Sequence, residues 1–154
     1  MAEPAPFGTG GFITRRVFTA VRDRVWREWT EPERFADWFG GAECEVPLST
    51  LSMDVRPGGG FRATMFCGPE RRVIRWTGEY HEVIAPERLV FTITDQPGGD
   101  SYELVTVQLT DLGDGRTEMH FEQRGHMRPD EYDYAKSGWG AFFARLDERL
   151  AGAP

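Results

Sequence analysis

The side chains that could hold a metal ion are few and lie on two separate stretches of the chain. His120 alternates with Glu118 and Glu122, and His81 alternates with Glu79. Imidazole and carboxylate groups are common metal ligands, so a metal patch would form if these two stretches were paired strands. An alternating polar row is also typical of the solvent-exposed face of a sheet. We favour the exposed face and predict no metal site.

Polar groups that could act on a bound substrate are also isolated in the sequence. The candidates are Tyr80, Tyr102, Arg62 and Glu28. General acid–base catalysis needs groups held beside the reacting atoms, but no carboxylate pair, Ser–His–Asp arrangement or G-x-S-x-G motif is legible. Arg62 alternates with apolar neighbours and is expected to face water. We predict no catalytic residue and no cofactor, and leave enzymatic activity open because such sites are assembled in space.

Any such groups would be positioned by a long helix predicted over residues 130–151, with Asp130 as its N-cap. Its apolar residues recur at three- and four-residue steps, which places them on one helix face. They are Trp139, Phe142, Phe143, Leu146 and Leu150. We interpret Gly138 and Gly140 as positions of close packing against Trp76 or Tyr80. The alternative is that this turn moves to admit a ligand.

The remaining chain is predicted as strands with one helical insertion. A strand over residues 12–19 precedes a short helix over residues 20–30 and then a second short helix. Thr30 and Glu33 have capping-box spacing at the start of the second helix, and Gly40-Gly41 ends it. Short alternating strands with tight turns follow and indicate an antiparallel sheet. They cover residues 44–47, 52–56, 61–67, 73–83, 88–94, 102–112 and 117–123.

The size and composition of the chain narrow the class of protein to which it can belong. The 154 residues predict one domain over residues 12–151 after a flexible arm at residues 1–11. A net charge of −7 disfavours nucleic-acid binding, and no apolar stretch is long enough to span a membrane. Cys44 and Cys67 have no C-x-x-C spacing and no secretory signal precedes them, so we expect reduced thiols in a cytoplasmic protein.

The aromatic content of 13% is high for a core of this size and favours a cavity lined by rings. The predicted fold is α+β, with a curved antiparallel sheet wrapped around the terminal helix. The wall of the cavity should come from inward strand positions, the short helices and the inner helix face. The predicted ligand-binding residues are Trp38, Phe39, Phe61, Met65, Trp76, Tyr80, Phe91, Met119, Phe121, Trp139, Phe142 and Phe143. The alternative is that these side chains form an ordinary core.

Short motifs in register along the chain carry a family resemblance. They are Val25-Trp26, residues 30–33 with Trp38-Phe39, and residues 54–61, 78–80, 86–91, 113–117 and 138–139. Each motif is weak alone, but together they span nearly the whole chain. The sequence resembles the START/SRPBCC superfamily with its helix-grip fold. Within it, the match is to the family named after the C-terminal domain of the activator of heat-shock protein 90 ATPase.

The resemblance implies a function of modest detail. Members of the superfamily bind lipids, polyketides, hormones or other apolar molecules, some relatives are cyclases or dehydratases, and the name-giving member is a co-chaperone. We predict a protein that binds an apolar or amphipathic small molecule between the sheet and the terminal helix. A cyclase- or dehydratase-like enzyme and a protein-interaction or co-chaperone-like module are the alternatives. Open sheet edges also suggest a homodimer.

Overall fold

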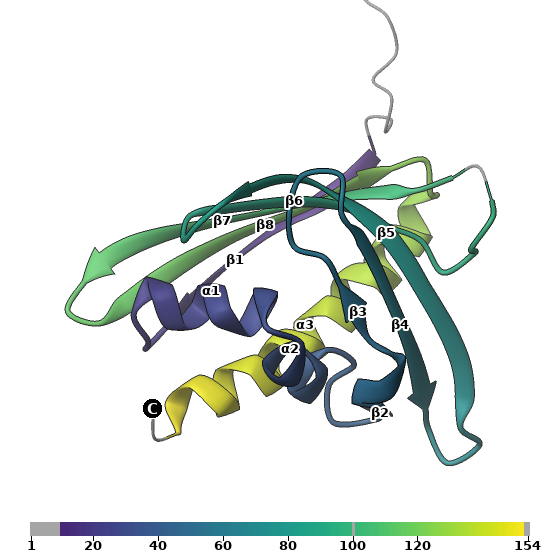
Figure 1. Ribbon diagram of the computed structural model, residues 1–154, viewed down its shortest axis with the longest axis horizontal. Helices are drawn as coiled ribbons and strands as arrows, with labels where there is room; N and C mark the ends of the chain where they lie inside the picture. Colours follow the sequence, from purple (N-terminus) through teal and green to yellow (C-terminus); the bar gives the residue numbers. More distant parts are fainter. Residues whose placement is uncertain (1–9, 100, 153–154) are drawn as a thin grey trace, which may run out of the picture.

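A long helix lies under an arched antiparallel sheet in the computed structural model, which describes residues 10–99 and 101–152 (Figure 1). This arrangement confirms the predicted α+β helix-grip architecture. In chain order the elements are β1 (Gly10–Phe18), α1 (Arg22–Thr30), α2 (Pro32–Trp38), β2 (Cys44–Glu45), η1 (Leu48–Thr50), β3 (Ser52–Met53), β4 (Gly60–Cys67), β5 (Arg72–Ile84), β6 (Arg88–Ile93), β7 (Glu103–Gly113), β8 (Arg116–Gly125) and α3 (Pro129–Ala151).

The strand order of the sheet is β1-β8-β7-β6-β5-β4-β2, and β3 also pairs with β4. All the pairings are antiparallel, as the tight turns predict. The alternating pattern directs one side-chain row of each strand towards the helices. In β8 this inner row is Thr117, Met119, Phe121 and Gln123, all of them buried. The sheet thus supplies a continuous inner face on which α1, α2 and α3 pack (Figure 1).

The starts of α2 and α3 differ from the sequence prediction. The Thr30 hydroxyl donates to the Trp26 carbonyl (2.9 Å) instead of capping α2, which begins with Pro32 in its first turn. Asp130 is not the N-cap of α3, because the helix already begins at Pro129, whose fixed φ suits a first helical position. The Glu131 carboxylate there accepts a hydrogen bond from the backbone N–H of Arg128 (2.9 Å).

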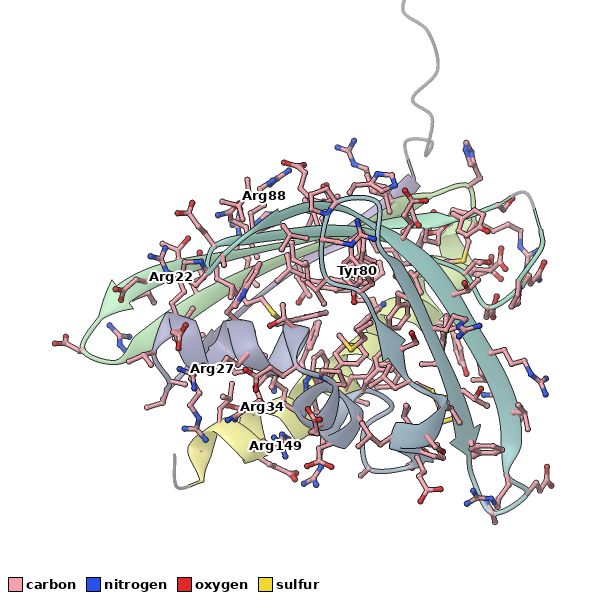
Figure 2. All side chains as sticks on the ribbon, viewed as in Figure 1. Arg22, Arg27, Arg34, Tyr80, Arg88 and Arg149 are labelled. Atoms are coloured by element: carbon pink, nitrogen blue, oxygen red, sulfur yellow. A yellow bond between two sulfur atoms is a disulfide. The ribbon has the colours of Figure 1, made fainter. Side chains whose placement is uncertain are left out.

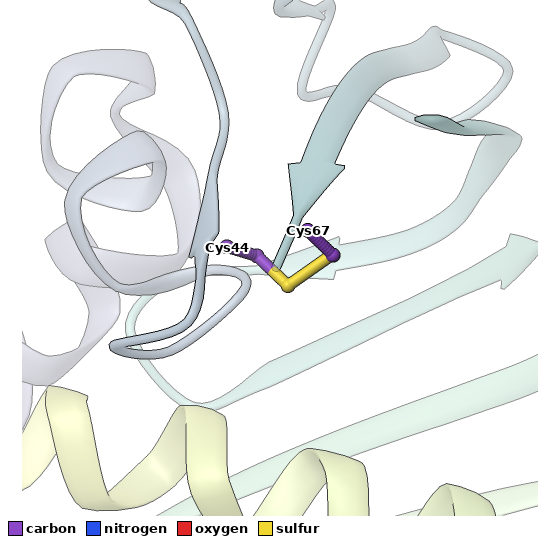
Figure 3. Close-up of a disulfide and its surroundings, with 2 residues drawn as sticks. All are labelled: Cys44 and Cys67. Carbon is purple, nitrogen blue, oxygen red and sulfur yellow. A yellow bond between two sulfur atoms is a disulfide. The ribbon is translucent and has the colours of Figure 1, made fainter. Parts of the chain in front are cut away.

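The expectation of reduced thiols is wrong in this structure, because Cys44 and Cys67 form a disulfide (Figure 3). The two residues lie directly opposite each other in the antiparallel pair of β2 with β4. Their separation of 23 residues hides this pairing in the sequence. Disulfides persist mainly in oxidising compartments, so the cysteines do not support the cytoplasmic location, which stays a prediction.

The start of β1 refines the predicted N-terminal boundary of the domain. The flexible arm was predicted for residues 1–11, but Gly10 and Gly11 belong to β1 and pair with Gly125 and Arg124. Residues 1–9 lie outside the described residues. Within the part of the chain that the structure describes, no helix has the length and apolarity needed to cross a membrane.

Candidate functional site

The predicted ligand-binding residues come together in the space between the sheet and α3. Ten of the twelve are buried, while Trp76 and Phe142 are half-buried. Their rings contact one another closely; the centroids of Phe121 and Trp139, for example, are 4.7 Å apart. Figure 2 shows side chains occupying the interior between the sheet and the helices. We call this set the interior cluster: Trp29, Phe35, Trp38, Phe39, Phe61, Met65, Trp76, Tyr80, Phe91, Met119, Phe121, Trp139, Phe142 and Phe143.

The sequence prediction missed Trp29, which lies at the centre of the interior cluster. Its side chain is 1% exposed, and its ring centroid is 4.8 Å from that of Trp38 and 6.1 Å from that of Trp139. It also stacks on Phe121 from β8 (6.2 Å), so it joins α1 to the sheet and to α3. The helical spacing of Trp29 after Val25 was the available signal for this position.

Two indole N–H groups of the interior cluster have no hydrogen-bond acceptor. They are those of Trp29 and Trp76, and in both residues the Nε1 atom itself is buried. The other two indoles of the cluster are satisfied: Trp38 Nε1 donates to the Glu28 carbonyl (2.8 Å) and Trp139 Nε1 donates to Gln123 Oε1 (2.9 Å). Buried donors in folded proteins are normally paired, so these two call for a specific explanation.

A polar chain on the inner face of β8 fixes the position of Trp139. Gln123 is 4% exposed, accepts from the Trp139 indole and donates through Nε2 to Glu103 Oε1 (3.0 Å). Its alternation with Met119 and Phe121 placed Gln123 on the inner face, but the sequence analysis did not single it out. The amide oxygen and the amide nitrogen of Gln123 each have a partner. The Gln123 side chain is therefore fixed in place and orients Trp139.

Tyr80 on β5 is the polar candidate that joins the interior cluster. Its ring lies 5.9 Å from that of Phe91 and 6.4 Å from that of Phe61, centroid to centroid. Burial raises the pKa of the Tyr80 hydroxyl, and the negative charge of Asp54 raises it further. Tyr80 is therefore a neutral hydroxyl over the whole physiological range, able to donate a hydrogen bond.

The other predicted polar groups do not face the interior cluster. The Glu28 carboxylate is buried but binds Arg149 (2.6 and 3.1 Å) and Arg34 (3.4 Å), which ties α1 to α2 and α3. The hydrogen bonds to the Glu28 carboxylate, together with its negative charge, raise the pKa of the Arg149 guanidinium. Arg62 is exposed as predicted, and Tyr102 is half-buried just before β7. Glu28 thus has a structural role at the junction of the helices.

The histidines and glutamates considered for a metal site are kept apart by the sheet topology. The strand of Glu118, His120 and Glu122 pairs with β1 and β7, whereas His81 and Glu79 lie on β5. His120 Nδ1 accepts a hydrogen bond from Arg15 Nε (3.2 Å). No group of three potential metal ligands occurs among the described residues.

Two hollows on the molecular surface lie away from the interior cluster. One of about 580 Å³ is bordered by α2, β2, η1 and the C-terminal half of α3, and includes Asp37, Val46 and Arg145. The other, of about 430 Å³, lies on the outer sheet face around Arg15 and His120. None of the twelve predicted ligand-binding residues lines either hollow.

The two glycines of α3 do not pack closely against the sheet, which corrects the interpretation made from the sequence. Apart from its chain neighbours and the nearby backbone of α3 itself, a Cβ atom built on Gly138 or on Gly140 would have no described atom within 4 Å. The space beside this turn of the helix is open on both flanks. Close packing instead occurs at Gly41, where a Cβ would lie 3.4 Å from the Ala141 carbonyl and from the Phe142 ring.

Comparison with known proteins supports the resemblance carried by the motifs. The model of the family described as "Activator of Hsp90 ATPase homolog 1-like protein" matches residues 19–151. The chain belongs to this family. No curated protein matches the sequence.

Several solved structures have the same fold as this chain at low sequence identity. Protein CV1439 from Chromobacterium violaceum is 22% identical with a TM-score of 0.78, covering 93% of this chain and 98% of that chain. The AHSA1 (SPO3351) protein from Silicibacter pomeroyi is 17% identical with a TM-score of 0.81, covering 92% and 98%. Protein Ms6760 from Mycobacterium smegmatis is 17% identical with a TM-score of 0.77, covering 94% and 92%. At these identities the likeness supports the fold alone.

Proposed function

We propose that the protein binds a neutral, apolar or amphipathic small molecule between the sheet and α3. The single observation that carries this proposal is the pair of buried indole N–H groups, of Trp29 and Trp76, that lack acceptors. An unsatisfied buried donor costs about 1–3 kcal/mol. A ligand that brings an acceptor oxygen into the interior cluster would recover that free energy for each donor it reaches.

The chemistry of the interior cluster defines the kind of ligand. Its unsatisfied polar groups are the two indole N–H donors, and it also contains the neutral Tyr80 hydroxyl. A charged ligand would lose its hydration there without gaining an opposite charge. Aromatic rings favour a flat apolar body, which they contact by offset or edge-on packing. A planar aromatic compound with a carbonyl or ether oxygen satisfies both requirements.

Entry of such a ligand requires rings to move, because the interior cluster is closely packed. Trp76 on β5 and Phe142 on α3 are its half-buried members, and the ring of Phe39 lies 6.1 Å from the first and 5.5 Å from the second. The open space beside Gly138 adjoins this part of α3. We place the entrance between these side chains.

The alternatives have less support from the observed geometry. An acid–base enzyme would need two titratable groups facing each other, whereas Glu28 is held by Arg149 and Arg34 away from Tyr80. A protein-interaction module would be favoured by a contiguous apolar surface. The large exposed apolar side chains instead come from separate elements, as Leu48, Ile84 and Tyr134 illustrate.

The experiment uses prodan, a neutral naphthyl ketone whose emission shifts to the blue when it leaves water. We expect saturable binding and a one-to-one complex in native mass spectra. Trp29→Phe keeps an aromatic ring but removes the donor, so it should weaken prodan binding by about three- to tenfold. The same variant should leave the binding of 2-(dimethylamino)naphthalene, which lacks the carbonyl, unchanged.

Trp26→Phe is the matched control, because Trp26 is a buried tryptophan of the same helix without a ring contact to the interior cluster in the described part of the chain. It should bind both compounds as the unmodified protein does. Absence of binding of either naphthalene, together with the absence of any co-purified small molecule in native mass spectra, would refute the proposed function.

A further inference from the structure

The strand β5 extends beyond its neighbour and leaves an open sheet edge. From Tyr80 to Ile84 it pairs with β6. Next to this region the Glu79 N–H donates to Thr92 Oγ1 on β6 (3.0 Å), and Thr77 forms a bridge with Thr94. Within the described residues, no pairing on this side is found before Thr77. Residues 72–76 pair with β4 on one side only. Figure 1 shows this lower half of β5 as the outermost strand on the right-hand side of the sheet. We call residues 72–76 the β5 edge.

The backbone of the β5 edge has hydrogen-bonding groups that point outwards. Thr77 exchanges two hydrogen bonds with Thr94, N to O distances of 3.0 and 2.9 Å. Successive residues of a strand direct their backbone groups to alternate sides, so Arg75 and Val73 point theirs to the same side as Thr77. No described strand follows on that side, and the Val73 side chain is 43% exposed. The edge is therefore accessible to another strand.

Arginines without acidic partners surround this edge. Arg62 on β4 and Arg75 on β5 are diagonal neighbours on the outer face, because Arg62 pairs with Thr77 and Thr64 with Arg75. Arg72 begins β5 and is also exposed. None of these three arginines forms an ion pair within the described residues. Glu79 follows in the same outer row of β5, but Arg62 and Arg75 remain without an ion-pair partner on a protein whose net charge is −7.

We propose that the β5 edge binds an extended acidic segment of another polypeptide, which adds to the sheet as a further strand. Backbone hydrogen bonds to Val73 and Arg75 would supply affinity, as in other cases of strand addition. Glutamate or aspartate side chains on the outer face of the added strand would meet Arg75 and, diagonally, Arg62, and guanidinium groups match carboxylates well. Trp76 belongs both to this edge and to the interior cluster, but Arg62 and Arg75 lie on the opposite, outer face of the two strands.

Charge complementarity identifies an acidic partner as the occupant of the edge, in preference to a second copy of the same edge. Two β5 edges paired antiparallel would bring arginines into proximity with arginines, and like charges across a strand pair are destabilising. Arginines at an open edge also prevent uncontrolled strand pairing. The edge is thus closed to its own copy and open to a segment of opposite charge.

The test measures fluorescence anisotropy of a fluorescein-labelled heptapeptide in which glutamate alternates with valine and isoleucine. We expect saturable binding that weakens as salt rises, because exposed charges are screened. A peptide with lysine in place of each glutamate should not bind. The charge-reversed protein R62E/R75E should lose the acidic peptide and gain the lysine peptide.

The backbone contribution is tested by Val73→Pro. Proline lacks a backbone N–H, and the N–H of Val73 points away from β4, so the hydrogen bonds between β4 and β5 are kept. We expect about three- to tenfold weaker binding than in Val73→Ala, which keeps the N–H. Circular dichroism and thermal unfolding establish that each variant is folded. Equal binding by these two folded variants, equal binding of both peptides, or no saturable binding at millimolar peptide would overturn the proposal.

Discussion

Trp139 connects the two kinds of interaction that stabilise the interior of the protein. Its ring centroid lies 4.7 Å from that of Phe121 and 5.7 Å from that of Phe143, so it joins α3 to the sheet. Its indole N–H donates to Gln123, which is itself held by Glu103. Trp139 therefore contributes both ring contacts and a hydrogen bond, whereas Trp29, whose N–H is unpaired, contributes ring contacts.

At this residue we predict that Trp139→Ala lowers the free energy of unfolding by about 3–5 kcal/mol, the usual range for deleting a large buried ring. Trp139→Phe is the matched control, because it keeps most of the apolar contact and loses the hydrogen bond to Gln123. It should therefore cost less than the alanine variant. Urea unfolding curves give both values, and a loss below about 1 kcal/mol for the alanine variant would remove Trp139 from the core.

Single residues also show where sequence reasoning reaches its limit. Periodicity is enough to predict that Phe121 and Trp139 face inwards, because it depends only on the local repeat. It does not predict the partners of Glu28, since Arg149 lies 121 residues away and reaches it only when α1 and α3 meet. The same holds for Trp29 Nε1, whose missing acceptor is a property of the packed interior.

At the scale of elements, Gly138 and Gly140 make α3 less stable than alanines at the same two positions would. Both occupy a helix interior with open space beside them, so an alanine methyl group would fit without a clash. We predict that Gly138→Ala and Gly140→Ala each raise the free energy of unfolding by up to about 1 kcal/mol, because glycine has the greater entropy when unfolded.

The control for this prediction is Gly41→Ala. Gly41 has a φ of +70° and lies against α3, so alanine there should destabilise the protein. Urea unfolding compares the three variants. If Gly138→Ala or Gly140→Ala instead lowered the stability, the glycines would be required for packing that the open flanks of α3 do not indicate.

Elements were predictable from the sequence where a local pattern defines them. The strands and the three α-helices are present near their expected positions, and the Gly40-Gly41 stop has the positive φ angles expected for it. The pairing of β2 with β4 is not local, and so the disulfide between Cys44 and Cys67 was missed. The free edge of β5 depends likewise on where β6 ends, which no pattern within β5 reveals.

For the whole molecule, the fold and the inward orientation of the rings were predictable, whereas the state of the interior was not. A curved sheet around one helix can enclose a cavity or a packed core, and the same apolar pattern is compatible with both. The structure has closely packed rings together with two unsatisfied indole donors. These two donors are the observation on which the proposed ligand binding rests.

The most direct test of this account is the ¹H–¹⁵N spectrum of the indole groups, recorded with and without prodan. The account predicts that the Nε1–H signals of Trp29 and Trp76 shift downfield on binding, because a hydrogen-bonded proton is deshielded. The signals of Trp38 and Trp139, whose donors already have acceptors, should move much less. Unchanged Trp29 and Trp76 signals at saturating prodan would contradict the claim that the interior cluster is the binding site.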